Sequence, residues 1–264
     1  MGRSGRDTLL EVHVQMNRPA PFLSIVLPCY NEAQGLERIL ESFSAYASDP
    51  FEQSSHNHTP PFELILVDNG STDNTQARLS MLLTHYSFAR VVTIENNQGY
   101  GHGLYTGLLE AKGDVLSWSH ADLQTDPGDI FKAYALYTKS SAPENTMVKG
   151  VRHGRCLSEN IVSKGMQFVA LLLLRQWIVE INAQPKVFHR NLLTNITAPP
   201  KDFNFDLYVL HKAKKLNYTI KTVHVQFPPR QYGQSNWSST WQSKINTIYQ
   251  SMLFMFNLGT GAWK

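Results

Sequence analysis

Short apolar, β-branched runs alternate with stretches of helical periodicity along the first half of the chain. The short runs are typical of buried strands, and they occur at 23–28, 62–67, 90–95 and 114–119. Apolar residues spaced by three and four positions predict helices at 36–43, 75–85 and 99–111. This repeated order of strand and helix predicts an α/β fold, in which helices cover both faces of a mainly parallel sheet.

The second half of the chain is less regular, but it carries the same two kinds of pattern. Strands are expected at 147–151 and 218–227, and helices at 163–178, 205–215 and about 240–257. Neither an internal repeat nor a clean linker divides the chain. We therefore expect a mobile polar tail at 1–20, one domain over 21–240, and an amphipathic C-terminal helix at 241–264.

Composition narrows the class of protein. The 264 residues are 42% hydrophobic and 17% charged, which is typical of a globular protein and excludes a disordered or fibrous chain. The net charge is only +3. So small an excess gives no support to nucleic acid binding, although an anionic substrate or lipid surface remains open.

Cysteine usage and apolar run lengths indicate a compartment. Cys29 and Cys156 are the only cysteines, which is too few for a disulfide framework and favours a reducing compartment. Two of the Asn-x-Ser/Thr sites, at Asn69 and Asn236, fall inside motifs with predicted chemistry, where a glycan would interfere. The longest apolar run, 168–174, is too short to span a bilayer. We expect a cytoplasmic protein that meets a membrane, if at all, from the side at its inner face.

The first polar motif, Pro28-Cys-Tyr30-Asn31-Glu32, lies where a strand turns into a helix. A helix N-terminus offers free N–H groups to an anion, and the ring of Tyr30 offers a face to a base. The alternative is an ordinary strand-to-helix turn in which Asn31 caps the helix.

The second motif, 67–73, follows the next strand. Asp68, at the strand end, can accept hydrogen bonds from a base or a ribose. Gly70 permits a tight turn, and capping of the following helix is enough to explain residues 71–73. Capping does not explain Asp68, because ligands in such sheets lie beyond the carboxyl ends of the strands.

The third motif, His120-Ala-Asp122-Leu-Gln124, follows the strand at 114–119. In extended backbone His120 and Asp122 point the same way, and Gln124 continues that face. Carboxylate oxygen suits Mg²⁺ or Mn²⁺, and imidazole suits Mn²⁺ better than Mg²⁺. A divalent ion here could hold a diphosphate and stabilise it as a leaving group. The alternative for an isolated His-x-Asp is a polar turn.

Four motifs follow one another along the chain: P-x-Y-N-E, V-D-x-G-S-x-D, N-x-G-x-G-x-G and x-A-D-L-Q. In this order they resemble the motifs of the family 2 glycosyltransferases, which have the Rossmann-like GT-A fold. The resemblance covers about 22–240 and is greatest to the dolichol-phosphate mannose synthase and polyprenyl-phosphate glycosyltransferase branch. It implies a nucleoside diphosphate sugar donor, a polyprenyl phosphate or other lipid-linked or glycan acceptor, Mg²⁺ or Mn²⁺, and inversion at the anomeric carbon. It also implies a role in making cell-envelope polysaccharide.

The resemblance assigns roles position by position. The residues that match nucleotide-binding positions are Pro28, Tyr30, Glu32 and Asp68. Asp122 matches the central metal-binding and catalytic aspartate, and Gln124 matches the neighbouring metal ligand. His120 departs from the pattern, because the synthases usually have Asp there. One negative charge is missing, so the metal site is expected to be weaker, to prefer Mn²⁺, or to need the donor diphosphate to complete it.

Downstream motifs extend the resemblance. Arg152 matches a phosphate or acceptor contact, with an exposed arginine as the alternative. Residues 182–190 match the segment that lines the donor sugar. Arg230 and Ser235 belong to an Arg-x-x-Gly-x-Ser element that can close over a diphosphate, with an ordinary polar loop as the alternative.

An acidic position opens the predicted helix at 205–215. Asp206 is the candidate general base on an acceptor hydroxyl, with Asp202 in reserve. The alternative is that Asp202 caps the helix and that Asp206 is stabilised by the helix dipole.

Two further questions stay open at this level. The missing charge at His120 leaves a nucleotide-sugar-binding protein with weak or no turnover as the alternative to an enzyme. In the C-terminal helix, an apolar stripe either packs on the sheet or lies on a lipid surface; it consists of Trp241, Ile245, Ile248, Tyr249, Met252, Leu253 and Phe256.

Overall fold

The computed structural model describes residues 22–47, 62–153, 157–228 and 241–263. Within these residues one sheet holds seven strands in the order β3-β2-β1-β4-β6-β5-β7. The strands are β1 (Leu23–Cys29), β2 (Phe62–Asn69), β3 (Ala89–Ile94), β4 (Val115–Trp118), β5 (Thr146–His153), β6 (Lys186–His189) and β7 (Thr219–Gln226). The tail at 1–20 lies outside the described residues, so its prediction stands untested.

Most strand pairs are parallel, as the alternating pattern predicts. β1 pairs in parallel with β2 and β4, β2 with β3, and β5 with β7. β6 runs antiparallel to both of its neighbours, β4 and β5. The predicted α/β class is therefore confirmed, with one reversed strand that the sequence did not predict.

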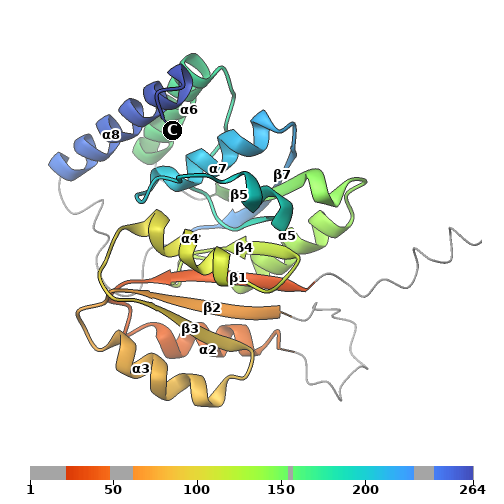
Figure 1. Ribbon diagram of the computed structural model, residues 1–264, viewed down its shortest axis with the longest axis vertical. Coiled ribbons are helices and arrows are strands. Elements are labelled where there is room, and N and C mark those ends of the chain that lie inside the picture. Colours follow the sequence, from red (N-terminus) through yellow and green to blue (C-terminus); the bar gives the residue numbers. More distant parts are fainter. Residues whose placement is uncertain (1–21, 48–61, 154–156, 229–240, 264) are drawn as a thin grey trace, which may run out of the picture.

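Helices cover both faces of the sheet (Figure 1). The helices are α2 (Leu36–Ser44), α3 (Thr75–Leu82), α4 (Tyr100–Glu110), α5 (Pro127–Thr138), α6 (Leu157–Leu174), α7 (Asn204–Lys215) and α8 (Trp241–Thr260). Short 3₁₀ turns lie at η1 (Leu83–His85), η2 (Pro143–Asn145) and η3 (Arg190–Asn195). α2, α3 and α5 contribute to the core on one face, and α4, α6, α7 and α8 to the core on the other. β1 is buried on both faces because its alternate side chains enter these two cores.

Two elements were not predicted, and one helix was predicted about five residues too late in the chain, since α6 spans Leu157–Leu174. α5 begins with Pro-Gly, and β6 has only four residues and starts with a lysine. The helix expected at 163–178 ends at Leu174 instead, because Arg175 takes a left-handed backbone conformation (φ 54°) that a helix cannot continue through.

The C-terminal helix presents most of its predicted apolar stripe outward. Ile245, Tyr249, Met252, Leu253 and Phe256 are all exposed. The helix is held by other side chains, since Phe254 and Met255 are buried in the core. α8 lies beside α6 (Figure 1). No helix in the described ranges is long and apolar enough to cross a membrane.

Candidate active site

Three of the predicted motifs meet at one edge of the sheet. The carboxyl ends of β1, β2 and β4 lie side by side, because these strands are parallel neighbours. Cys29 at the end of β1 is the register partner of Asp68, and the N–H of Ser119 donates to the carbonyl of Val26 (3.2 Å). The topology thus brings together residues that lie far apart in the sequence.

Asn31 ties the first motif to the second. Its backbone is left-handed (φ 58°), and its Oδ1 accepts the N–H groups of Thr72 (2.8 Å) and Asp73 (3.3 Å). Its own N–H donates to Ser71 Oγ (3.1 Å). Asn31 therefore does not cap its own helix, whose N-cap is Gly35 without a side-chain hydrogen bond. It fixes the separation of the two loops instead.

Asp68 is buried at the end of β2, with 2% of its surface exposed. Its Oδ1 accepts the N–H of Ser71 (3.1 Å), across a turn in which Gly70 is left-handed (φ 68°). Burial, and then the carboxylates of Glu32 and Asp68, raise the pKa of the Cys29 thiol well above its usual range. The two predicted nucleotide contacts Glu32 and Asp68 thus both lie near Cys29, and Cys29 is no nucleophile. Partly exposed at the same edge are Pro28 and Tyr30.

The third motif forms a tight turn after β4. Asp122 Oδ1 accepts the backbone N–H of Gln124 (3.1 Å), and Leu123 between them is left-handed (φ 59°). Gln124 Nε2 donates to the carbonyl of Pro228 (3.0 Å), which lies two residues after the end of β7. Burial lowers the pKa of His120, although Asp122 and Asp206 oppose it, so the imidazole is held neutral.

These residues offer part of a metal site. A neutral imidazole, a carboxylate and an amide oxygen are suitable ligands for Mn²⁺ or Mg²⁺. In the part of the chain that the structure describes, no three His, Cys, Asp or Glu side chains converge as a metal site. The donor set of His120, Asp122 and Gln124 therefore fits an ion that takes its remaining ligands from a diphosphate and water.

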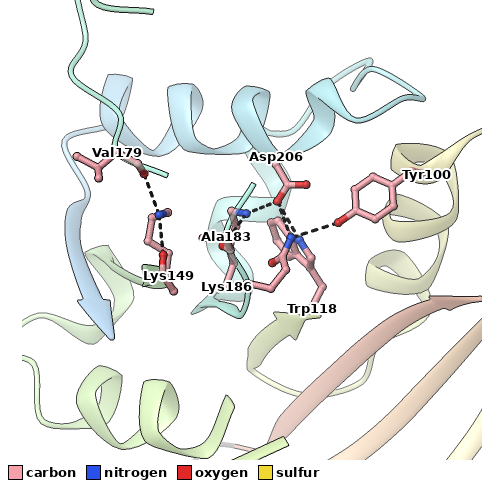
Figure 2. A network of polar contacts seen from close by, with 9 residues as sticks. Tyr100, Trp118, Lys149, Val179, Ala183, Lys186 and Asp206 are labelled. Atoms are coloured by element: carbon pink, nitrogen blue, oxygen red, sulfur yellow. Dashed lines mark hydrogen bonds and ion pairs between the residues drawn. The ribbon is translucent and has the colours of Figure 1, made fainter. Parts of the chain in front are cut away.

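Asp206 lies at the centre of a buried polar network in the first turn of α7 (Figure 2). It is 1% exposed. Its Oδ1 accepts hydrogen bonds from Trp118 Nε1 (3.3 Å) and Gln184 Nε2 (2.9 Å), and it pairs with the ammonium group of Lys186. Burial lowers the pKa of Lys186, which is 0% exposed, while Asp206 raises it. Asp206 and Lys186 thus form a buried salt bridge, and Trp118 and Gln184 supply further hydrogen-bond donors to the carboxylate.

Tyr100 closes the network from the start of α4 (Figure 2). Its hydroxyl accepts a hydrogen bond from Gln184 Nε2 (3.2 Å). Burial, and then the Asp206 carboxylate, raise the pKa of Tyr100 well above its usual range, so its phenol stays protonated. Its ring stacks on Phe203, with 4.9 Å between centroids and 20° between planes.

Arg152 reaches the same region from the end of β5. Its Nε donates to Glu180 Oε2 (2.8 Å), and its guanidinium lies 5.3 Å from the ring centroid of Phe227. Arg152 and Lys186 both act to lower the pKa of His120, while Asp122 and Asp206 raise it. Arg152 therefore belongs to the electrostatic surroundings of the third motif.

Lys149 is a second buried lysine, and it is the direct register partner of Lys186 across β5 and β6. Its Nζ donates to the carbonyls of Gly150 (2.8 Å) and Val179 (2.9 Å) (Figure 2). Burial, and then the charge of Lys186, lower the pKa of Lys149 to about 7. The strands β5 and β6 thus carry two neighbouring buried amines.

A family model described as glycosyl transferase family 2 matches residues 24–179, more than half of the 264-residue chain. The chain belongs to glycosyltransferase family 2. The predicted family and the predicted enzyme class are both confirmed. This glycosyltransferase has the Asp68 turn and the His120–Gln124 turn within the matched span.

Two of the similar proteins are named for transfer to a polyprenyl phosphate. The glycosyltransferase is 25% identical over 248 residues to the dolichyl-phosphate beta-glucosyltransferase of Dictyostelium discoideum, covering 88% of this chain and 71% of that protein. It is 35% identical over 120 residues to the undecaprenyl-phosphate 4-deoxy-4-formamido-L-arabinose transferase of Pseudomonas savastanoi pv. phaseolicola, covering 45% of this chain. That match spans only 33% of the bacterial protein's length.

The fold is shared with a solved structure. Glucosyl-3-phosphoglycerate synthase from Mycobacterium tuberculosis superposes with a TM-score of 0.68 and 18% identity, covering 99% of this chain and 86% of that chain. The likeness confirms a GT-A-type fold for the glycosyltransferase.

The structure adds residues that the sequence did not single out for the site. Around Asp206 these are Tyr100 and Trp118, and beside Arg152 they are Lys149 and Glu180. Gln184 and Lys186 lie in the segment 182–190, which the resemblance assigns to the donor sugar, but no individual role was predicted for either residue. The sequence signal that could have pointed to this network is Lys149, a lysine within an otherwise mainly apolar strand. Asp202 Oδ1 accepts the N–H of Asn204 (2.9 Å) in the turn before α7, but the N-cap of that helix is Phe203, which makes no side-chain hydrogen bond. Arg230 and Ser235 lie outside the described residues, and their roles stay predictions.

The buried amine of Lys149 predicts a pH-dependent stability difference. Its pKa is about 7 in the folded protein against an ordinary 10.5, so between these values only the unfolded chain holds the proton. Lys149→Met should therefore be stabilising relative to wild type at pH 7 and below. Its advantage should shrink by about 1.4 kcal/mol for each pH unit above 7. Urea unfolding across the pH range measures this slope.

Loss of the two hydrogen bonds to Gly150 and Val179 offsets the gain by an amount that does not vary with pH, so the slope is the decisive quantity. The exposed Lys139→Met is the matched control and should show no slope. An equally flat difference for Lys149→Met would mean that the amine stays charged in the folded protein.

Proposed function

We propose that this glycosyltransferase moves a sugar from a nucleoside diphosphate sugar to a polyprenyl phosphate, with inversion and with help from Mn²⁺ or Mg²⁺. The observation that carries the proposal is the meeting of the nucleotide and metal motifs at one sheet edge, together with a basic residue whose ion-pair partner Glu180 follows exposed apolar side chains in the chain. The arginine is Arg152, and the apolar residues are Trp177 (52% exposed) and Val179 (38%).

The donor would be held by the first two motifs. Glu32 and Asp68 both lie near Cys29, in the two loops that Asn31 joins, and Tyr30 is available to stack on a base. Carboxylates in this position suit the hydroxyl and N–H donors of a ribose or base, whereas they repel phosphate. The diphosphate is therefore assigned to the neighbouring turn at 120–124 and to Arg152.

The metal would be held by Asp122, with His120 and the Gln124 amide oxygen as further ligands. A divalent ion there supplies positive charge that stabilises the departing nucleoside diphosphate. The mycobacterial synthase of the same fold has been solved with Mn²⁺ and UDP, which supports a metal-assisted reaction without assigning it to this chain. The neutral imidazole of His120 favours Mn²⁺ over Mg²⁺.

The acceptor decides what Asp206 does. A phosphate acceptor is already ionised at neutral pH and needs little base catalysis, whereas a hydroxyl acceptor needs a general base. Asp206 already accepts from three donors, which suits it to holding Gln184 and Lys186 in place. With a polyprenyl phosphate acceptor, we assign Asp206 this positioning role.

An apolar surface near the site would receive the lipid. α6 exposes Phe168, Leu171 and Leu172, and the adjacent α8 exposes five apolar side chains of its stripe. A pair of amphipathic helices lying on the interface is one way in which a protein holds a lipid-linked substrate.

The exposed apolar side chains of α6 and α8 predict that the protein binds lipid vesicles through apolar contacts. Leu172→Glu with Tyr249→Glu should abolish co-sedimentation with vesicles of phosphatidylethanolamine and phosphatidylglycerol, since both residues are at least 60% exposed. Binding of the wild type should be modest and largely insensitive to salt. Met81→Glu, at an exposed apolar residue of α3, is the matched control and should still bind.

Point variants are preferable to deleting the helix. Phe254 and Met255 of α8 are core residues, so deletion of 241–264 is expected to unfold the protein and would not test lipid binding. Equal vesicle binding by the double variant and the wild type would contradict the proposed lipid surface.

A panel of donors tests the proposed function directly. UDP-glucose, UDP-N-acetylglucosamine and GDP-mannose, each with Mn²⁺, should include one that raises the melting temperature by mass action. Release of the nucleoside diphosphate on adding polyprenyl phosphate would identify an enzyme. A thermal shift without release would favour the alternative, a nucleotide-sugar-binding protein without turnover, whereas no shift with any donor would contradict both.

A further inference from the structure

Three aromatic rings from separate parts of the chain gather beside Asp206. Tyr100 begins α4, His120 follows β4, and Phe203 precedes α7. The Tyr100 ring stacks on Phe203 (4.9 Å, 20°) and lies 6.1 Å from the His120 ring at 36°. Phe203 is nevertheless 39% exposed, although phenylalanine is among the residues most often buried in protein cores.

The position of the two stacked rings is set by backbone contacts. Gly99 is left-handed (φ 105°), and a Cβ there would lie 2.4 Å from the carbonyl oxygen of Lys201. That same carbonyl accepts the N–H of His102 (3.1 Å). The segment before α7 therefore rests directly on the start of α4, which holds Phe203 against Tyr100 without help from a ligand.

An unpaired acceptor lies next to the stacked rings. Gln184 is 2% exposed, and its Nε2 donates to Tyr100 Oη (3.2 Å) and Asp206 Oδ1 (2.9 Å). Its Oε1 has no hydrogen-bond partner among the described residues. A buried acceptor without a partner is uncommon, and a hydroxyl donor from a ligand would satisfy it.

We propose that Tyr100 and Phe203 form the platform for the sugar ring of the donor, with Gln184 Oε1 accepting one sugar hydroxyl. A hexose has an apolar face of C–H groups and a rim of hydroxyls, which matches an aromatic surface bordered by a polar acceptor. The platform lies between the metal motif at His120 and the Asp206 network. The inference rests on the proposed function, because it names the residues that bind the sugar within the same site.

Binding of donor and of nucleoside diphosphate separates the sugar contact from the rest of the site. In calorimetric titrations with Mn²⁺, Phe203→Ala should bind the preferred nucleotide sugar about tenfold more weakly, or roughly 1.4 kcal/mol. Its affinity for the corresponding UDP or GDP should stay within about twofold of wild type. Phe203→Tyr keeps a ring and should restore donor affinity, and Met81→Ala, at another exposed apolar residue, should change neither affinity.

Two results would overturn the platform while leaving the proposed function intact. One is unchanged donor affinity in Phe203→Ala, and the other is equal weakening of donor and diphosphate, which would indicate a structural role. If the wild-type protein binds neither the nucleotide sugars nor the diphosphates, the proposed function fails and the platform fails with it.

Discussion

Asp122→Asn should abolish sugar transfer while the protein keeps its fold. The asparagine retains an Oδ1 that can accept the Gln124 N–H, so the turn is preserved and only the negative charge is lost. Metal stabilisation of a leaving group contributes several kcal/mol, so we expect a loss of about a thousandfold in kcat. Steady-state release of the nucleoside diphosphate, with Mn²⁺ present, measures the effect.

Asp126→Asn is the matched control for this variant. Asp126 lies four positions further along, and its Oδ1 accepts the Gly128 N–H (2.7 Å) as the N-cap of α5. Asparagine caps a helix about as well as aspartate, so neither stability nor transfer should change appreciably. Wild-type transfer by Asp122→Asn would mean that the metal and the diphosphate lie elsewhere.

Asp206→Ala should be strongly destabilising. It leaves the ammonium group of Lys186 buried at 0% exposure without its carboxylate, and breaking a buried ion pair in this way costs about 3–5 kcal/mol. Replacing both partners, as in Asp206→Leu with Lys186→Met, removes the unpaired charge and should recover most of that loss. Urea unfolding at pH 7 compares the three proteins.

The double variant also separates folding from chemistry. A positioning role for Asp206 predicts reduced but measurable transfer to a polyprenyl phosphate once stability is recovered. Complete loss of transfer in a stable double variant would instead contradict a purely positioning role for Asp206. A single variant that loses less than about 1 kcal/mol would contradict the buried ion pair itself.

The first half of the fold could be predicted because its strands are apolar along their whole length. β1 and β2 enter the sheet core on both faces, so their hydrophobic runs are continuous, and polar residues begin where the strands end. Since parallel strands end at one edge, Asp68 and Asp122 could be placed in one site from sequence alone.

The polar network around Asp206 could not be predicted in this way. Lys149 lies within β5 and Lys186 begins the four-residue β6, and a lysine in a strand normally indicates a solvent-facing position. Only the reversal of β6 between β4 and β5 makes these two lysines direct neighbours and brings Lys186 to Asp206. Such a long-range strand order leaves no periodic signal along the chain.

The C-terminal helix shows a different limit. Periodicity correctly grouped Ile245, Tyr249 and Phe256 on one face, but it could not say which side of the helix contacts the protein. Phe254 and Met255, which lie off that stripe, are the side chains that enter the core. A hydrophobic pattern identifies a shared face, whereas the packing of α8 against α6 determines which face is covered.

The most direct test of the proposed function is the fate of a radiolabelled donor sugar. The protein is incubated with the donor that stabilises it, Mn²⁺ and undecaprenyl phosphate in vesicles, and the products are extracted into organic solvent. We predict label in the lipid fraction as a sugar joined to the lipid phosphate, with inverted anomeric configuration and one nucleoside diphosphate released for each sugar transferred. Donor consumption with all label left in the aqueous phase would contradict transfer to a polyprenyl phosphate.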